Sequence, residues 1–197
     1  MTWTEILNQI NDNYFNQQTH ETLEKSKLLG YLDNETIKNK WLGNNPCTSD
    51  QIKNLELKLG VTIPTSFKDF LLVSNGFKNI APMVGNLNPI ERIDWVKNTE
   101  QEWLEIISKF NYPVSDEKYF DYSENQDSAY FRNEYLKDCL KISEWEDGVI
   151  ILLNPNVKYD SEWEVIEYGT WYPGASRFKS FFDYMIAKKN CDVTLWN

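Results

Sequence analysis

Apolar residues in the first half of the chain recur at the spacing of a helical face, with interruptions typical of helix ends. Residues 59–77, LGVTIPTSFKDFLLVSNGF, contain a proline and a Thr-Ser pair within a largely apolar run. Gly60 can take the left-handed conformation that ends a helix, and Pro64 has a φ suited to the start of the next one. The pattern therefore predicts two amphipathic helices joined end to end.

The two helices are expected at about residues 49–59 and 64–74. Thr48 and Gln51 have the spacing of a capping box at the start of the first. The pair Asn75-Gly76 tolerates positive φ and is expected just after the second. The predicted apolar faces contain Ile52, Leu55 and Leu59 in the first helix, and Phe67, Phe70, Leu71 and Ser74 in the second.

Three other segments of the first half carry recognisable patterns. The stretch PMVGNLNPIERIDW is rich in Pro, Gly and Asn, which predicts a short, irregular strand at a sheet edge. Thr99 and Glu102 have the spacing of a second capping box. Two further helical faces are expected, an N-terminal one with Trp3, Ile6, Leu7 and Ile10, and one after Thr99 with Trp103, Ile106, Ile107 and Phe110.

The second half of the chain has a different pattern. KISEWEDGVIILLNP places Asp147-Gly148 between apolar stretches, which predicts a turn between strands, and SEWEVIEYGTWY alternates over part of its length. RFKSFFDYMIAKK predicts a closing amphipathic helix. Helices followed by strands and a last helix indicate the α+β class, with an antiparallel or mixed sheet and helices packed against it.

Composition adds size and setting. With 197 residues the chain is expected to form one domain, and its mean hydropathy of −0.58 is typical of a soluble protein. The start MTWTEILNQINDNYF lacks the features of a signal peptide, so a cytoplasmic location is expected. Cys47, Cys139 and Cys191 are far apart and odd in number, which favours reduced structural thiols.

The chain resembles bacterial members of the SUKH superfamily, which includes the yeast Smi/Knr-type cell-wall regulator. The similarity begins in WLGNNPCTSDQIKNLELKLGVTIPTSFKDFLLVSNGF and continues through SDEKYFDY, ILLNP, EWE, W-x-PGA and RFKSF, over about residues 37–187. The chain departs from the pattern at Cys47, where a small residue is expected, and at Ser161, where glycine is common. The expected structural signature is Trp41, Gly43, Glu56, Gly60, Pro64, Phe67, Phe70, Asn75, Gly76, Trp171, Pro173, Gly174 and Phe181.

The resemblance implies a single SUKH-like domain over residues 37–197, with residues 1–36 as an N-terminal helical extension packed on it. It also implies a protein-binding function without a catalytic centre or cofactor. Many bacterial SUKH proteins are regarded as immunity proteins that neutralise toxins, often nucleases, delivered by neighbouring cells. Other members act as scaffolds or regulatory binding modules, and the resemblance leaves both roles open.

Few residues offer chemistry for an enzyme. His20 lies in a polar stretch without a nearby Cys or His, so neither a metal site nor a nucleophile–base pair is expected. Glu162 and Glu164 are spaced to share a strand face, which suits acid–base work, but flanking Trp163 on a solvated sheet face is the favoured interpretation. TWYPGAS suits an aromatic sugar platform, although a turn that covers the core is favoured.

Acidic residues are concentrated in one part of the chain. Residues 114–167 contain fourteen Asp and Glu against five Lys and Arg, so this segment carries −9 of the total charge of −10. An acidic surface repels phosphate backbones and attracts basic protein surfaces, such as the substrate groove of a nuclease. For any single acidic residue, the alternative is that it keeps the protein surface soluble and binds no partner. The candidate partner-binding residues are Asp116, Glu117, Tyr119, Asp121, Tyr122, Glu124, Asp127, Glu162 and Glu164.

Three hypotheses follow from these observations. The first is an immunity protein that binds a basic toxin domain, with no direct nucleic-acid or membrane contact. The second is a scaffold or regulatory module of the same fold. The third, a hydrolase that uses carboxylates, requires a concave pocket with convergent acids of perturbed pKa. For Tyr119 and Tyr122, contact with a partner and packing over the sheet are equally compatible with the sequence.

Overall fold

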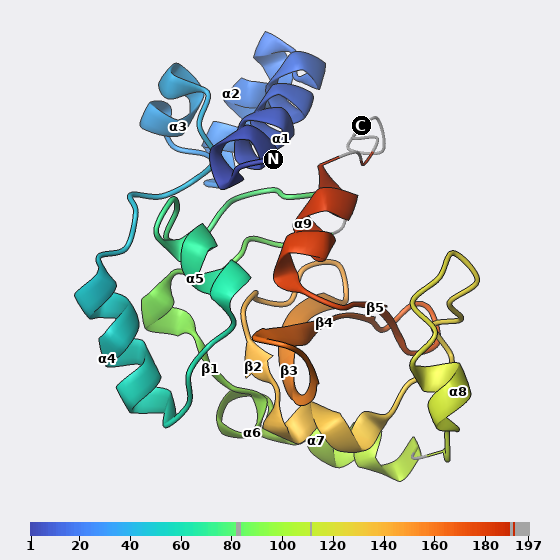
Figure 1. Cartoon of the computed structure of the whole chain (residues 1–197). Helices are drawn as coiled ribbons and strands as arrows, with labels where there is room; N and C mark the ends of the chain where they lie inside the picture. Colours follow the sequence, from blue (N-terminus) through green and yellow to red (C-terminus); the bar gives the residue numbers. More distant parts are fainter. Residues whose placement is uncertain (82–83, 111, 190, 192–197) are drawn as a thin grey trace.

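A five-stranded antiparallel sheet organises the molecule (Figure 1). The computed structural model describes residues 1–81, 84–110, 112–189 and 191. Each strand pairs with the next one along the chain, in the order β1-β2-β3-β4-β5. The α+β class predicted from the sequence is therefore confirmed. The strands are β1 (Asp94–Trp95), β2 (Leu140–Lys141), β3 (Val149–Tyr159), β4 (Glu162–Gly169) and β5 (Ala175–Phe178).

The central strands β3 and β4 are buried on both faces. Ile151 and Leu153 of β3 contribute to one apolar core, whereas Ile150 and Leu152 contribute to a second core on the opposite face. This explains why ILL in β3 is a continuous apolar run instead of an alternating one. Both faces of the sheet are accordingly covered by other parts of the chain.

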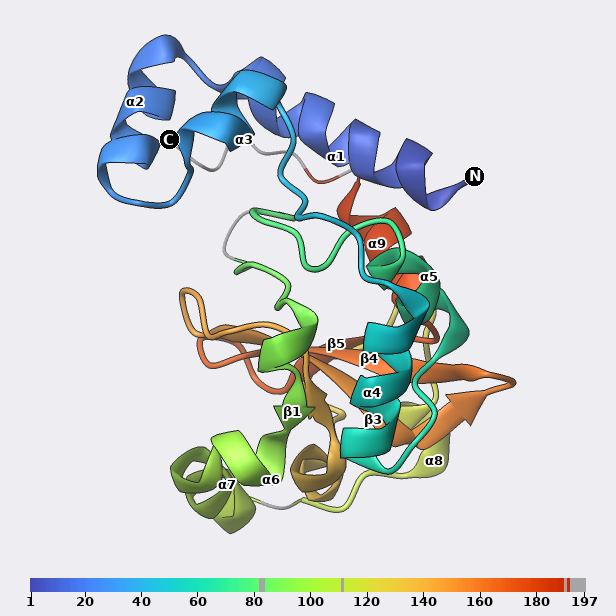
Figure 2. The same cartoon turned by 90° about the vertical axis from the view of Figure 1, so that its left-hand side faces the viewer.

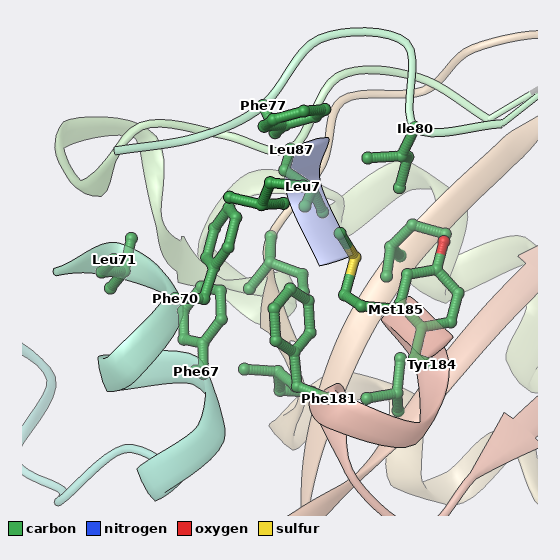
Figure 3. Close-up of a cluster of buried hydrophobic side chains, with 14 of the residues drawn as sticks. Leu7, Phe67, Phe70, Leu71, Phe77, Ile80, Leu87, Phe181, Tyr184 and Met185 are labelled. Atoms are coloured by element: carbon green, nitrogen blue, oxygen red, sulfur yellow. The ribbon is translucent and has the colours of Figure 1, made fainter. Parts of the chain in front are cut away.

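Helices from both ends of the sequence cover the first face. Figure 3 shows Phe67 and Phe70 meeting Phe181 in this core. The ring centroids of Phe67 and Phe70 lie 4.9 and 5.2 Å from that of Phe181. The helices that contribute residues to this first core or pack against it are α1 (Trp3–Gln17), α2 (His20–Leu28), α3 (Asn34–Asn39), α4 (Ser49–Leu59), α5 (Thr65–Leu71) and α9 (Phe181–Lys188).

α4 and α5 begin and end largely as the sequence predicts. The capping box of Thr48 and Gln51 begins α4, and Gly60 ends it with a φ of 71°. α5 stops at Leu71, three residues before the expected end. The Leu71 carbonyl accepts a hydrogen bond from Cys47 N at 2.8 Å, and Asn75 N donates to Asn45 O instead of continuing the helix. The connection before α4 thus occupies the backbone groups of Leu71 and Asn75 that a continued helix would pair with each other.

The N-terminal helix shares its core with α5 and α9. Trp3 of α1 packs against both Phe70 and Phe181, with ring centroids 5.7 Å apart in each pair. Asn11 of α1 also accepts a hydrogen bond from Leu42 N at 2.8 Å. The domain division at residue 36 falls inside α3 and remains a proposal.

Short helices cover the second face and lie at the opposite end from α1 and α9 (Figure 2). Val96, Tyr119 and Leu136 contribute to the second core from this layer. The predicted edge strand is β1, limited to two residues, while Pro82 and Met83 lie outside the described residues. The short helices of this layer are α6 (Val96–Thr99), α7 (Gln101–Ile107), η2 (Ser108–Phe110), α8 (Asp116–Tyr119) and η3 (Asn133–Asp138), whereas η1 (Ile90–Arg92) contributes Ile90 to the first core.

The predicted capping box of Thr99 and Glu102 is wrong. Thr99 ends α6, its hydroxyl donates to Trp95 O, and α7 begins without a side-chain cap. The predicted helical face is only partly correct. Trp103 and Ile107 pack against the second core, but Ile106 and Phe110 are 57% and 52% exposed.

The register of that face changes because the α-helix ends at Ile107. The next turn, η2, is a 3₁₀-helix with three residues per turn, so Phe110 no longer follows the α-helical stripe. The closing helix is also shorter than predicted. Arg177 and Phe178 belong to β5, and Ser180 caps α9 by accepting from Asp183 N at 3.0 Å.

Replacing Phe70 by alanine should lower the free energy of unfolding by about 3–5 kcal/mol, because a fully buried ring in an aromatic cluster leaves a cavity. Denaturant titration measures the change. Leu72→Ala is the matched control, since Leu72 ends the same helix but is 43% exposed and should cost under about 0.5 kcal/mol. A loss below about 1 kcal/mol for Phe70→Ala would contradict the assigned packing.

Candidate partner-binding surface

Residues 115–131 form an acidic surface segment, which we name the acidic loop (Figure 1). It carries five acids and one lysine. Asp116, Glu117, Glu124 and Asp127 are exposed, and Asp121 is half-buried. Four of the five candidate acids in the acidic loop therefore lie at the surface.

A buried carboxylate lies beneath the acidic loop. Glu164 of β4 is 0% exposed, and its oxygens accept hydrogen bonds from Tyr119 Oη at 2.6 Å, Tyr122 Oη at 2.7 Å and Asn154 Nδ2 at 2.8 Å. The expected position of Glu164 on a solvated sheet face is therefore wrong. Tyr119 is buried and Tyr122 half-buried, so both match the alternative of packing over the sheet.

Burial controls the protonation of this cluster. Desolvation raises the pKa of Glu164, although the three hydrogen bonds and the charge of Arg177 oppose the effect. Burial and the neighbouring Glu164 also raise the pKa of Tyr119 and of Tyr122. The two phenols therefore stay protonated and act as hydrogen-bond donors to the carboxylate.

Arg177 of β5 supplies positive charge on the same side of the sheet. It is 3% exposed, donates through Nη1 to the Tyr119 carbonyl, and its guanidinium lies 4.4 Å from the Tyr119 ring centroid. Arg177 makes no ion pair of 4.0 Å or less with Glu164 among the described residues. Tyr119 instead touches both groups, because its ring packs on the guanidinium and its hydroxyl binds the carboxylate.

Gln126 holds the acidic loop against the edge strand β5. Its Nε2 donates to Asp121 O at 3.1 Å and to Arg177 O at 3.0 Å, and its Oε1 accepts from Arg177 N at 2.7 Å. The Asp121 carboxylate accepts from Ser123 N at 2.9 Å, and hydrogen bonds from Ser123 lower the Asp121 pKa. Hydrogen bonds from both side-chain and backbone groups therefore tie the acidic loop to β5.

The start of the acidic loop is held by Arg132. Its guanidinium forms an ion pair with Asp116 and donates to Val114 O at 2.7 Å from Nη2. The same group lies 4.7 Å from the Tyr119 ring centroid. Asp116 therefore has an internal partner, whereas no ion pair involves Glu117, Glu124 or Asp127 within the described parts of the chain.

Glu162 is a helix cap instead of a free surface acid. Its carboxylate accepts from Ser66 N at 2.9 Å and from the Ser66 hydroxyl, which satisfies a backbone donor in the first turn of α5. Trp163, between the two glutamates, is buried in the first core. The expectation that Glu162 and Glu164 lie free on a solvated sheet face is therefore wrong for both glutamates.

Glu162 and Glu164 do not form an accessible pair of acids for catalysis. Both oxygens of Glu164 already accept hydrogen bonds, and Glu162 binds α5. Among residues 1–81, 84–110, 112–189 and 191, no group of three or more His, Cys, Asp or Glu could hold a metal ion. Burial raises the pKa of the Cys47 thiol to about 11, which disfavours a thiolate nucleophile. That the chain is not an enzyme remains a prediction.

Comparison with known families supports the resemblance seen in the sequence. The model of the SMI1 / KNR4 family (SUKH-1) matches residues 46–184. The chain belongs to the SUKH-1 family. No curated protein matches this SUKH-1 chain. Within its described residues, none of the helices has the length and apolar character needed to cross a membrane.

Several expected signature residues of this SUKH-1 protein lie at connections. Glu56 accepts from Ile63 N at 3.0 Å and pairs with Lys68 at 2.9 Å, which joins α4 to α5. Gly76 has a φ of 88°, and a Cβ there would lie 2.7 Å from Leu87 O. The remaining signature residues comprise half-buried Trp41 and Gly43, buried Pro64 and Phe181, half-buried Asn75 and Gly174, and exposed Gly60 and Pro173, with Phe67 and Phe70 in the core.

The TWYPGAS segment differs from its predicted packing. Trp171 is 60% exposed and therefore does not cover the core. Tyr172 is half-buried and donates from its hydroxyl to Glu167 O at 2.8 Å. The turn is thus fixed by Tyr172, while the neighbouring indole lies at the surface. Sequence periodicity did not indicate that Trp171 is exposed while Tyr172 is half-buried.

The raised pKa of Glu164 predicts a pH-dependent stability. A folded-state pKa above the ordinary glutamate value of 4.5 means that the folded state holds this proton more tightly than the unfolded chain. The contribution of Glu164 to the free energy of unfolding should therefore decrease as the pH rises from about 4.5 through the raised pKa. Glu164→Gln, which stays neutral, should gain stability relative to wild type over that window.

Urea titrations at a series of pH values measure this difference. Glu134→Gln is the control, because Glu134 is exposed and the change removes a carboxylate without touching the buried network. If the stability difference between wild type and Glu164→Gln stayed constant across the window, the assigned protonation behaviour would be refuted.

Gln126→Ala should release the acidic loop from β5, because three hydrogen bonds to the loop and the strand are lost. Amide exchange in residues 121–127 should accelerate roughly tenfold or more, while the core strands remain protected. Hydrogen–deuterium exchange with mass spectrometry provides the measurement. Asn125→Ala is the neighbouring control at an exposed position, and equal exchange in the two variants would argue against the clamp.

Proposed function

We propose that this SUKH-1 protein is a cytoplasmic immunity protein that binds a basic toxin domain through the acidic loop. The observation that carries the proposal is the presentation of Glu117, Asp121, Glu124 and Asp127 on a loop fixed from below by Glu164. Membership of the SUKH-1 family supports a protein-binding role. The expected partner is a toxin whose substrate groove carries Lys and Arg.

Electrostatics favour this class of partner. The chain has a net charge of −10, so long-range attraction accelerates encounters with a basic surface and opposes contact with phosphate backbones. A nuclease groove must attract nucleic acid and is therefore complementary to this loop. Covering such a groove would block substrate access without any chemical step by the immunity protein.

The rigidity of the acidic loop supports tight binding. A mobile loop loses conformational entropy when a partner orders it, and this loss reduces affinity. Here Gln126 fixes the loop on β5, and Tyr119 and Tyr122 fix it over Glu164, before any partner arrives. The acids are consequently held in place as a set.

The association rate with the toxin encoded by the neighbouring gene should fall when the loop is neutralised. For the triple variant Asp121→Asn, Glu124→Gln, Asp127→Asn we expect a roughly tenfold slower association at low salt and a smaller difference at high salt, because salt screens exposed charges. The amides keep the acceptor oxygens that Asp121 and Asp127 use in their turns. Surface plasmon resonance at two salt concentrations separates association from dissociation.

The matched control removes the same number of negative charges from another part of the surface. Asp12→Asn, Glu21→Gln, Glu24→Gln removes three exposed acids from α1 and α2, away from the acidic loop in Figures 1 and 2. If both triple variants associate as fast as wild type at low salt, the acidic loop is not the steering surface. Protection of cells from that toxin then distinguishes immunity from a scaffold role.

A further inference from the structure

An apolar groove lies between the helices next to the acidic loop. It has a volume of about 420 Å³. Leu104 and Ile107 are its half-buried apolar residues, and both also pack against the second core. Asn133 Nδ2 donates to Phe110 O at 2.7 Å, which joins η3 to η2 and fixes the two walls. The lining comprises Leu104, Glu105, Ile107 and Ser108 on one wall and Asn133, Glu134 and Lys137 on the other.

The stretch of chain from α7 to Tyr112 exposes three large apolar side chains. Ile106 is 57% exposed, Phe110 is 52% exposed and Tyr112 is 72% exposed, within one short stretch of chain. Neighbouring exposed apolar side chains of this size mark interaction surfaces more often than single ones do. A cavity of this volume can take one or two apolar side chains of a partner.

Charges at the groove define the chemistry of its occupant. Glu105 and Glu134 are exposed on opposite walls, and neither forms an ion pair with any residue that the structure describes. Lys137 is the base in the lining. An apolar segment flanked by Lys or Arg therefore fits both the cavity and its acidic walls. A second copy of this chain, with its net charge of −10, would bring acids against acids.

The η3 wall of the groove follows the acidic loop closely along the chain. η3 begins directly after Arg132, and Arg132 pairs with Asp116 at the start of that loop. A partner seated on the acidic loop is therefore positioned to extend a segment into the groove. The two surfaces would act at different steps, since exposed charges accelerate encounter and buried apolar contacts slow dissociation.

We propose that the groove between α7 and η3 binds an apolar segment of the basic protein partner, flanked by Lys or Arg that meet Glu105 and Glu134. The inference rests on the proposed function, because it places a second contact of the same partner beside the acidic loop. In this proposal the groove slows dissociation of the partner, and the acidic loop accelerates its association.

Filling the groove tests the proposal directly. Ser108→Trp places a large ring at an exposed wall position whose side chain donates only to Glu105 O, so the core is left intact. The probe is a fluorescein-labelled amphipathic helical peptide of about 14 leucines and lysines. We expect saturable binding to wild type and an affinity weaker by about tenfold or more for Ser108→Trp. Ser49→Trp, at an exposed position on α4, should bind as wild type does.

Charge reversal provides a second, independent variant. Glu105→Lys, Glu134→Lys should weaken peptide binding without filling the cavity, and a peptide with glutamate in place of lysine should not bind wild type. Circular dichroism establishes that each variant is folded. Equal peptide affinity for wild type and Ser108→Trp, or no saturable binding to wild type, would overturn the groove proposal.

Parallel measurements separate this inference from the proposed function. Loss of peptide binding in Ser108→Trp but not in the acidic-loop triple variant supports the groove, whatever the toxin association rates show for the acidic loop. The reverse result overturns the groove and leaves the acidic loop as the binding surface. Binding of phosphatidylserine vesicles in place of the peptide, or dimerisation that Ser108→Trp abolishes, also overturns the proposed occupant.

Discussion

The buried carboxylate of Glu164 is the interaction on which the candidate surface depends. A glutamate removed from water without partners is costly, and here hydrogen bonds from Tyr119, Tyr122 and Asn154 provide the compensation. Two of those donors belong to the acidic loop and the third to β3. The need to satisfy one charge inside the sheet layer therefore fixes the path of a surface loop.

The same requirement divides the acids of this SUKH-1 protein into two groups. Glu162 and Glu164 are used internally, one as a cap for α5 and one as an acceptor beneath the loop. Glu117, Glu124 and Asp127 remain at the surface. The electrostatic field is therefore generated by residues of the acidic loop, while one buried acid of β4, Glu164, binds that loop from below.

The sheet makes this arrangement possible because both of its faces are covered. Aromatic helices pack on one face, where Phe67, Phe70 and Phe181 meet, so that layer is apolar and closed. The opposite layer combines an apolar core with the buried polar cluster around Glu164. Short helices and loops can bend around such a cluster, which explains why the second face carries both the acidic loop and the α7–η3 groove.

The sequence by itself determined the features that depend on neighbours along the chain. The capping box at Thr48, the left-handed Gly60 and the turn at Asp147-Gly148 need only local backbone geometry, and all three are present. The α+β class and the faces of α4 and α5 followed from apolar spacing. The excess of acid in residues 114–167 was also readable directly.

Only the tertiary structure decided which polar residues are buried. Glu164 meets Tyr119 and Tyr122 across 45 and 42 residues, and Glu162 reaches Ser66 across 96. The end of α5 likewise depends on a hydrogen bond from the distant Cys47. A glutamate in an alternating strand has the same local pattern whether it faces water or a buried hydroxyl, because the partner that satisfies its charge is chosen by the folding of the whole chain.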